Sequence, residues 1–169
     1  MSSDPLALFY AYSVELEREA RDRYAEFAES LATHHNAEVS AFFARMADEA
    51  AGHLAEVFEI VGDLPLPALH AWEFEWPDAE APETAAYEVL HYRMSLRDAM
   101  QIALENERAA ERFYRDYAAR SADARVVRAA GEFADEEASH ARQLEALISA
   151  APPTGRFARE EDDAPVIPE

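Results

Sequence analysis

Four stretches of the chain carry apolar residues at intervals of three and four positions, which is the spacing of one face of an α-helix. They span residues 5–31, 37–61, 95–120 and 124–150. The pattern predicts four long helices, each of which buries one face. The expected core positions are Leu6, Tyr10, Ser13, Ala20, Tyr24, Phe27, Leu31, Val39, Phe43, Met46, Ala50, Val57, Ile60, Met100, Ala103, Ala110, Tyr114, Tyr117, Val126, Ala130, Phe133, Leu144 and Leu147.

The links between these helices differ greatly in length. Two breaks are short, whereas residues 62–95 contain four prolines and cannot form one regular helix. Within that link, Pro82 is expected to start a short helix that runs through Tyr92. Short links make antiparallel hairpins, and a long link lets the second hairpin run back across the first. We therefore predict an all-α antiparallel four-helix bundle over residues 1–151, with a long crossover at about 62–95 between helices 2 and 3. Residues 152–169 are expected to be an acidic, Pro-rich tail.

Composition narrows the classes of function. The chain has 35 acidic and 15 basic residues, and its formal charge of −20 argues against nucleic-acid binding and against docking on an anionic membrane. No apolar stretch is long enough to span a bilayer, and no basic segment precedes an apolar run near the N-terminus. We therefore expect a cytoplasmic protein. The absence of Cys excludes disulfides, thiolate catalysis and Cys-ligated metal centres.

The two halves of the chain resemble each other. Residues 11–28 align with 101–118, so that Glu17 corresponds to Glu107, and residues 46–53 align with 133–140. Two similar helical hairpins predict a pseudo-two-fold bundle in which each half contributes equivalent side chains to one central site.

Charged and ionisable residues interrupt the apolar stripes at their centres. Glu17, His53, Glu107, Glu137 and His140 all fall on predicted core faces. An ionised carboxylate in a dry core is very costly unless it is paired or bound to metal, so a multivalent cation is the simplest common partner. The i, i+3 spacing of Glu137 and His140 lets both reach one ion. Carboxylate and imidazole together suit iron or manganese, and zinc remains open. Other glutamates are expected on solvated faces: Glu15, Glu19, Glu49, Glu105 and Glu136.

Three motifs resemble those of rubrerythrins, a ferritin-like di-iron carboxylate family, over about residues 5–150. Residues 17–24 resemble the first-helix pattern Glu-x-x-Ala-x-x-x-Tyr, residues 107–114 are similar, and residues 135–140 resemble Glu-Glu-x-x-His. The resemblance implies a ferritin-like fold, and two irons that are bridged by carboxylates and react with peroxide or oxygen. It implies that Glu17, Glu107 and Glu137 are the catalytic carboxylates, with Glu17 and Glu107 terminal and Glu137 bridging. His53 and His140 would be the imidazole ligands. It also implies a homodimer.

The chain departs from the family pattern in two places. Ala50 stands three residues before His53, where the first half should supply a Glu. Three outcomes are open: Glu49 swings in as a substitute metal ligand, water fills the gap, or one metal position is weakened or lost. The lack of Cys excludes a rubredoxin-like iron centre, so that the protein would need an external electron donor.

Three functions remain open on the sequence. The first is a di-iron oxidoreductase that reduces peroxide or oxidises Fe(II) with oxygen. The second is a non-catalytic protein that binds or delivers iron or another divalent metal, and the third is a structural bundle without metal.

Overall fold

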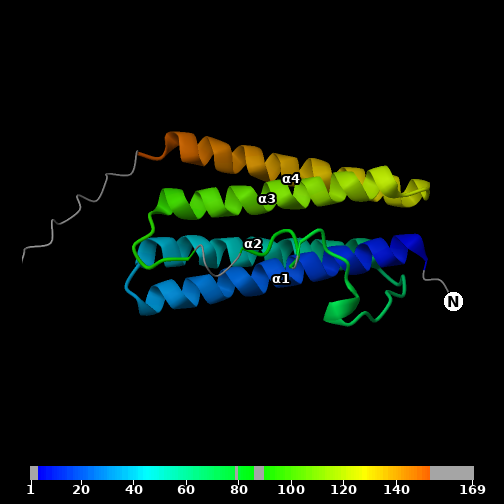
Figure 1. Ribbon diagram of the computed structural model, residues 1–169, viewed down its shortest axis with the longest axis horizontal. Helices are drawn as coiled ribbons and strands as arrows, with labels where there is room; N and C mark the ends of the chain where they lie inside the picture. The colour runs from blue at the N-terminus through cyan, green and yellow to red at the C-terminus, as the bar shows by residue number, and fades with distance from the viewer. Residues whose placement is uncertain (1–3, 79, 86–89, 153–169) are drawn as a thin grey trace, which may run out of the picture.

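The computed structural model describes residues 4–78, 80–85 and 90–152, and it contains four long helices (Figure 1). They are α1 (Pro5–Thr33), α2 (Ala37–Val61), α3 (Leu96–Arg120) and α4 (Ala124–Ala150), and a short 3-10 helix, η1 (Ala71–Glu73), lies in the crossover. No strand occurs among the described residues. The predicted all-α, ferritin-like four-helix bundle is confirmed.

The helices pair as two antiparallel hairpins, with α1 against α2 and α3 against α4 (Figure 1). Polar side chains cap the helices after each link. Asn36 accepts a hydrogen bond from the backbone of Val39, and Asp123 accepts one from Arg125. At the start of α3, Ser95 and Asp98 form a reciprocal capping box.

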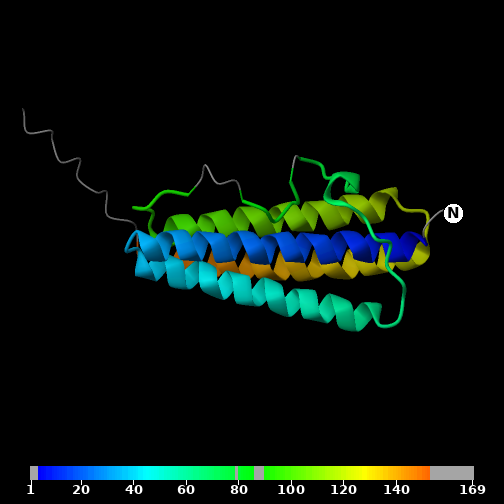
Figure 2. The same ribbon diagram turned by 90° about the horizontal axis from the view of Figure 1, so that it is seen from below.

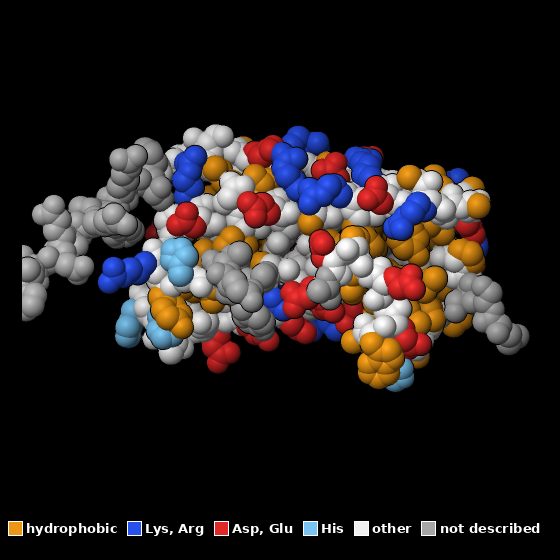
Figure 3. All heavy atoms as spheres, viewed as in Figure 1, with side chains coloured by type: hydrophobic (Ala, Val, Ile, Leu, Met, Phe, Trp, Pro, Cys, Tyr) orange, Lys and Arg blue, Asp and Glu red, His pale blue; other side chains and the backbone are white. Residues whose placement is uncertain are grey.

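The crossover between α2 and α3 runs along the face of the bundle formed by α1 and α3 (Figure 2). Its first part packs on Tyr12, whose hydroxyl accepts a hydrogen bond from the backbone N–H of Glu75 at 2.8 Å. Figure 3 shows this face with acidic and basic side chains interspersed around the crossover. The helix expected from Pro82 to Tyr92 is wrong for the described residues, because 82–85 and 90–92 form turns and irregular backbone. Residues 86–89 lie outside the described part of the chain.

The interior consists of two apolar clusters that follow one another along the bundle. One contains residues 20–31 of α1 and 99–104 of α3, and the other contains residues 9–16 of α1 and 110–114 of α3. Helices α2 and α4 are divided in the same way. The helix positions between the two clusters are those that carry the predicted Glu and His residues. A polar layer therefore crosses the middle of an otherwise apolar core.

Two predicted core positions are wrong. Ile60 and Leu147 are 55% and 51% exposed. Both line cavities that open between α2 and α4, because these two helices do not close on each other there. The predicted tail lies outside the described residues, except for its first residue. None of the helices in the described part of the chain combines the length and the hydrophobicity of a transmembrane segment.

Candidate metal centre

Each of the four helices contributes one or two side chains to the polar layer. Glu17 of α1, Glu107 of α3 and Glu137 of α4 are only 3–4% exposed. His53 of α2 and His140 of α4 are partly buried. The structure therefore brings together five of the six residues predicted as metal ligands.

The two hairpins make matching glutamate–histidine pairs. In the first, Oε2 of Glu17 lies 3.7 Å from Nδ1 of His53. In the second, Nδ1 of His140 lies 3.4 Å from Oε2 of Glu107 and 3.3 Å from Oε2 of Glu137. The predicted pseudo-symmetry is thus visible in the site itself, with Glu137 as the additional carboxylate of the second hairpin.

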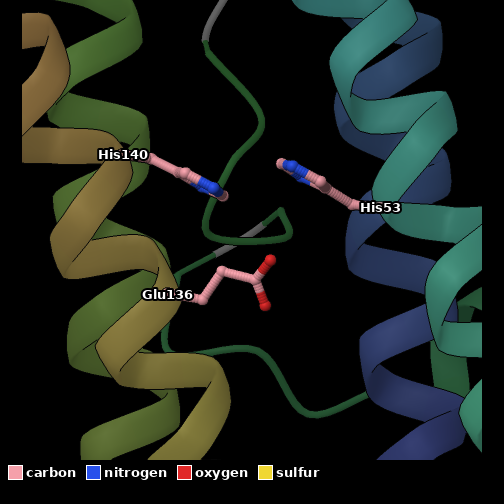
Figure 4. Close-up of side chains that lie close together, drawn as sticks. All are labelled: His53, Glu136 and His140. Carbon is pink, nitrogen blue, oxygen red and sulfur yellow. The ribbon is translucent and has the colours of Figure 1, made fainter.

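The imidazole rings of the two hairpins face each other. The rings of His53 and His140 stack with their centroids 4.6 Å apart. Figure 4 shows them pointing toward one another from α2 and α4, with Glu136 below them. Ligand atoms of His53, Glu136 and His140 lie within 4.8 Å of one another, and those of Glu107, Glu137 and His140 do the same. Glu136 is exposed, as expected, yet it lies at the edge of this group.

The sixth predicted ligand, Glu49, lies outside both groups. It is exposed on α2 and lines a cavity of about 330 Å³ that also reaches Glu107 and His140. Its neighbour Ala50 is buried, with 5% exposure. Helix α2 therefore presents a histidine to the interior but no buried carboxylate.

The structure adds a residue that the sequence analysis missed. Glu83, from the crossover, is 4% exposed, and its charge interacts with those of Glu17, Glu107 and Glu137. Burial, followed by these carboxylates, raises the pKa of Glu83 well above its usual range. Helical periodicity could not find Glu83, because it lies outside the helices. The structure buries Glu83 together with the alternate positions Ala81 and Ala85, and the sequence carries no signal for that burial.

The electrostatics show how strongly these groups affect one another. Burial opposes protonation of His53, but the adjacent Glu17 outweighs burial and raises the pKa of His53 to about 9. Glu107 and then Glu137 raise the pKa of His140 to about 10. Burial raises the pKa of Glu137 to about 8, and it also raises the pKa of Glu17. The layer therefore holds protons near neutral pH that a cation could displace.

The donor set fits a divalent cation. Among the described residues, Oε2 of Glu17, Glu83 and Glu107 has no hydrogen-bond partner, although each atom is buried. Buried polar atoms are normally satisfied, whereas Oε2 of Glu17 and Oε2 of Glu107 have only their longer contacts with His53 and His140, so these oxygens can accept a cation. In the described part of the chain, the ion pairs of Glu17, Glu107 and Glu137 are with histidine and not with arginine. An arginine network does not explain their burial.

Two cavities lead to the layer from the α2 and α4 side. The larger, of about 330 Å³, is lined by apolar residues such as Phe42 and Met46 and ends at Glu107 and His140. The smaller, of about 30 Å³, touches Glu17, His53 and Glu137. A small molecule such as oxygen or peroxide can approach the imidazoles from this side.

Comparison with known sequences identifies the family. The sequence model of the rubrerythrin family matches residues 9–148, which include all four helices almost entirely.

The chain belongs to the rubrerythrin family.

Among solved structures, the chain is similar to an uncharacterized conserved protein from Magnetospirillum magnetotacticum MS-1. The two share 33% identity over 89% of this chain and 97% of the other, with a TM-score of 0.65. No curated protein matches this chain. In this rubrerythrin-family chain, the buried carboxylates and imidazoles lie in the middle of the bundle, where residues from both hairpins meet.

Proposed function

We propose that this rubrerythrin-family protein is a di-iron carboxylate oxidoreductase that reduces peroxide or oxidises Fe(II) with oxygen. The observation that carries the proposal is the polar layer, in which three buried glutamates meet two imidazoles inside an apolar core and, among the described residues, form ion pairs only with these histidines. Its membership of the rubrerythrin family supports iron as the metal, and manganese or zinc would fit the same donor types.

The geometry suggests how the residues would divide two metal ions. Glu17 and His53 of the first hairpin would hold one ion, and Glu107 and His140 of the second would hold the other. Glu137 is the remaining carboxylate beside His140, and we assign it the bridging position. When bound, two irons would supply electrons to peroxide or oxygen by cycling between oxidation states.

The residues around the layer limit what reaches it. The two apolar clusters on either side exclude water along the bundle axis, so that access is through the cavities between α2 and α4. When a cation binds His53 and His140 in place of their protons, these protons are released to the site. With no Cys in the chain, electrons would come from an external donor, and peroxide would consume two electrons and two protons to give two waters.

Anaerobic titration with Fe(II), followed by oxygen or peroxide, tests the proposal. Two equivalents with rapid oxidation are expected, and Glu137→Ala should abolish tight binding while Glu132→Ala, an exposed site on the same helix, should not. If the Glu137→Ala protein binds iron normally, the assigned site is wrong.

The absence of a buried carboxylate on α2, at Ala50, favours a second candidate, a protein that binds or delivers iron with little turnover. Tight Fe(II) binding without oxidation would support that carrier. No binding of any divalent metal would contradict both proposals and leave a structural bundle.

A further inference from the structure

We propose that Glu83, from the crossover, is a metal ligand of the central site and supplies the carboxylate that α2 lacks at Ala50. The proposal rests on the proposed function only in that the polar layer binds divalent metal. It assigns a ligand that comes from outside the four helices.

The first observation is the burial of Glu83 without a partner. Its side chain is 4% exposed, and Oε2 has no hydrogen-bond partner among the described residues. The flanking positions, Ala81 and Ala85, are also buried, yet they are small and apolar. A carboxylate in this position is costly unless it binds something, and an apolar residue would fill the space without that cost. The arrangement therefore indicates a ligand for Glu83.

The second observation is that Glu83 is close enough to the layer for the charges of the layer to affect it, while the residues on either side of it are bonded to α1 beside Glu17. The charges close enough to affect it are those of Glu17, Glu137 and Glu107, which are the three carboxylates already assigned to the site. When these carboxylates are ionised they repel one another, and a cation that they share would relieve this repulsion. Four buried carboxylates carry the charge that balances two divalent ions, whereas three do not.

The third observation is that α1 holds the crossover on both sides of Glu83. The Glu19 carboxylate accepts hydrogen bonds from the backbone N–H of Ala81 at 3.4 Å and from the hydroxyl of Thr84 at 3.3 Å. The sequence predicts Glu19 on a solvated face, but the structure shows that its carboxylate binds the crossover. It lies half a turn from Glu17 and fixes the crossover next to the site.

Arg23 makes a second anchor one turn further along α1. Its guanidinium forms an ion pair with Glu80 at 3.1 Å and donates a hydrogen bond to the carbonyl of Ala85. The two anchors thus span residues 80–85 with Glu83 between them. A preorganised ligand loses less entropy when it binds metal, so fixed flanks are what a ligand on a nonhelical segment requires.

The crossover and the imidazoles reach the layer from different sides of the bundle. The crossover lies on the face formed by α1 and α3 (Figure 2), whereas His53 and His140 project from α2 and α4 (Figure 4). The hydrogen bonds of Ala81 and Thr84 to Glu19 hold the backbone around Glu83 on the α1 side, whereas the imidazoles come from α2 and α4. A carboxylate from that side complements the existing set without competing for the same positions.

Anaerobic titration with Fe(II) of wild type, Glu83→Gln and Glu75→Gln tests the assignment. Gln keeps the size of Glu83 but removes the anionic ligand, and Glu75 is an exposed glutamate of the same crossover. We expect two equivalents for wild type and Glu75→Gln. We expect loss of one equivalent in Glu83→Gln, or a second affinity weakened on the order of ten-fold or more. Two equivalents with unchanged affinity in Glu83→Gln would overturn the assignment while the proposed function survives. No binding by wild type would instead refute the function itself.

A double variant, Glu83→Gln with Ala50→Glu, separates a ligand role from a purely structural one. It returns a carboxylate to the interior from α2, three residues before His53, without restoring Glu83. We expect the double variant to bind a second equivalent of Fe(II) again. A double variant that binds only one equivalent of Fe(II) would overturn the claim that Glu83 substitutes for position 50. The apo form of Glu83→Gln should unfold at the same temperature as apo wild type or higher, because Gln can be buried without the cost of protonating a carboxylate. A marked fall in that temperature would show that Glu83 serves folding and not metal.

Discussion

The imidazole rings of His53 and His140 lie parallel, with an interplanar angle of 1°, although the two residues belong to different hairpins. Each ring presents Nδ1 to a carboxylate of its own hairpin. The stacked pair is therefore the point at which the two halves of the bundle meet. It places two imidazoles side by side, as two adjacent metal positions would require.

Replacing either histidine should remove one metal position. We expect His53→Ala and His140→Ala each to lose about one equivalent of Fe(II) in anaerobic titration. The loss in affinity should be larger for His140→Ala, because Nδ1 of His140 lies near two carboxylates and that of His53 near one. His91→Ala, at an exposed position of the crossover, is the control. A His140→Ala protein that still bound two equivalents with native affinity would contradict the site.

A Tyr24→Phe variant tests whether the tyrosines beside the layer have a structural role. The buried hydroxyl of Tyr24 accepts a hydrogen bond from Nδ2 of Asn106 at 2.9 Å. Tyr24→Phe would leave that buried amide without its acceptor, and it should lower the free energy of unfolding by about 1–3 kcal/mol. Urea unfolding of the apo-protein measures the change, with the exposed Tyr92→Phe as control. Unchanged stability together with slower Fe(II) oxidation would point to a redox role instead.

The pH dependence of apo-protein stability follows from the raised pKa values. The pKa of His53 is raised to about 9 and that of His140 to about 10, so the stability they contribute is complete below pH 6.5 and is lost as pH rises through those values. The pKa of Glu137 is raised to about 8, so this group also favours folding less as pH rises from 4.5 to 8. All three changes have the same sign between pH 6.5 and 8.

Each group can contribute up to about 1.4 kcal/mol per pH unit, so we expect the apo-protein to lose roughly 1–4 kcal/mol of stability per pH unit in this window. Most surface carboxylates are already ionised there, so they contribute little to the slope. The metal-loaded protein should not show the loss, because a bound cation holds the same groups deprotonated. Thermal unfolding at pH 6.5, 7.2 and 8, with and without metal, measures both slopes. An apo-protein that becomes more stable across this range would be inconsistent with protonated histidines in the layer.

Much of the site could be predicted because it lies on helices. The 3.6-residue period places Glu17 and Glu107 on the same face as their apolar neighbours, and the structure buries both there. The four-helix fold could be predicted from the same pattern, together with the different lengths of the links between the helices. Glu83 could not be found in this way, since its burial depends on contacts between the crossover and α1 that have no sequence period. The exposure of Ile60 and Leu147 could not be predicted either, because it depends on how far apart α2 and α4 lie and not on either helix alone.

Arg23 provides a test of the crossover that leaves every proposed ligand in place. It contacts Glu80 and the carbonyl of Ala85 but is not part of the polar layer. Arg23→Met keeps most of the side-chain volume and removes the contacts with Glu80 and Ala85 together with the ion pair to Glu26 on the same helix, which should let residues 80–85 move away from α1. We expect the stoichiometry to stay at two while the weaker Fe(II) affinity falls on the order of ten-fold.

Arg21→Met, an exposed arginine of the same helix paired with Asp22, should leave the affinity unchanged. Because Arg23 acts by positioning Glu83, adding Arg23→Met to Glu83→Gln should weaken binding no further. An additive loss in that double variant would show that Arg23 affects the site by another route.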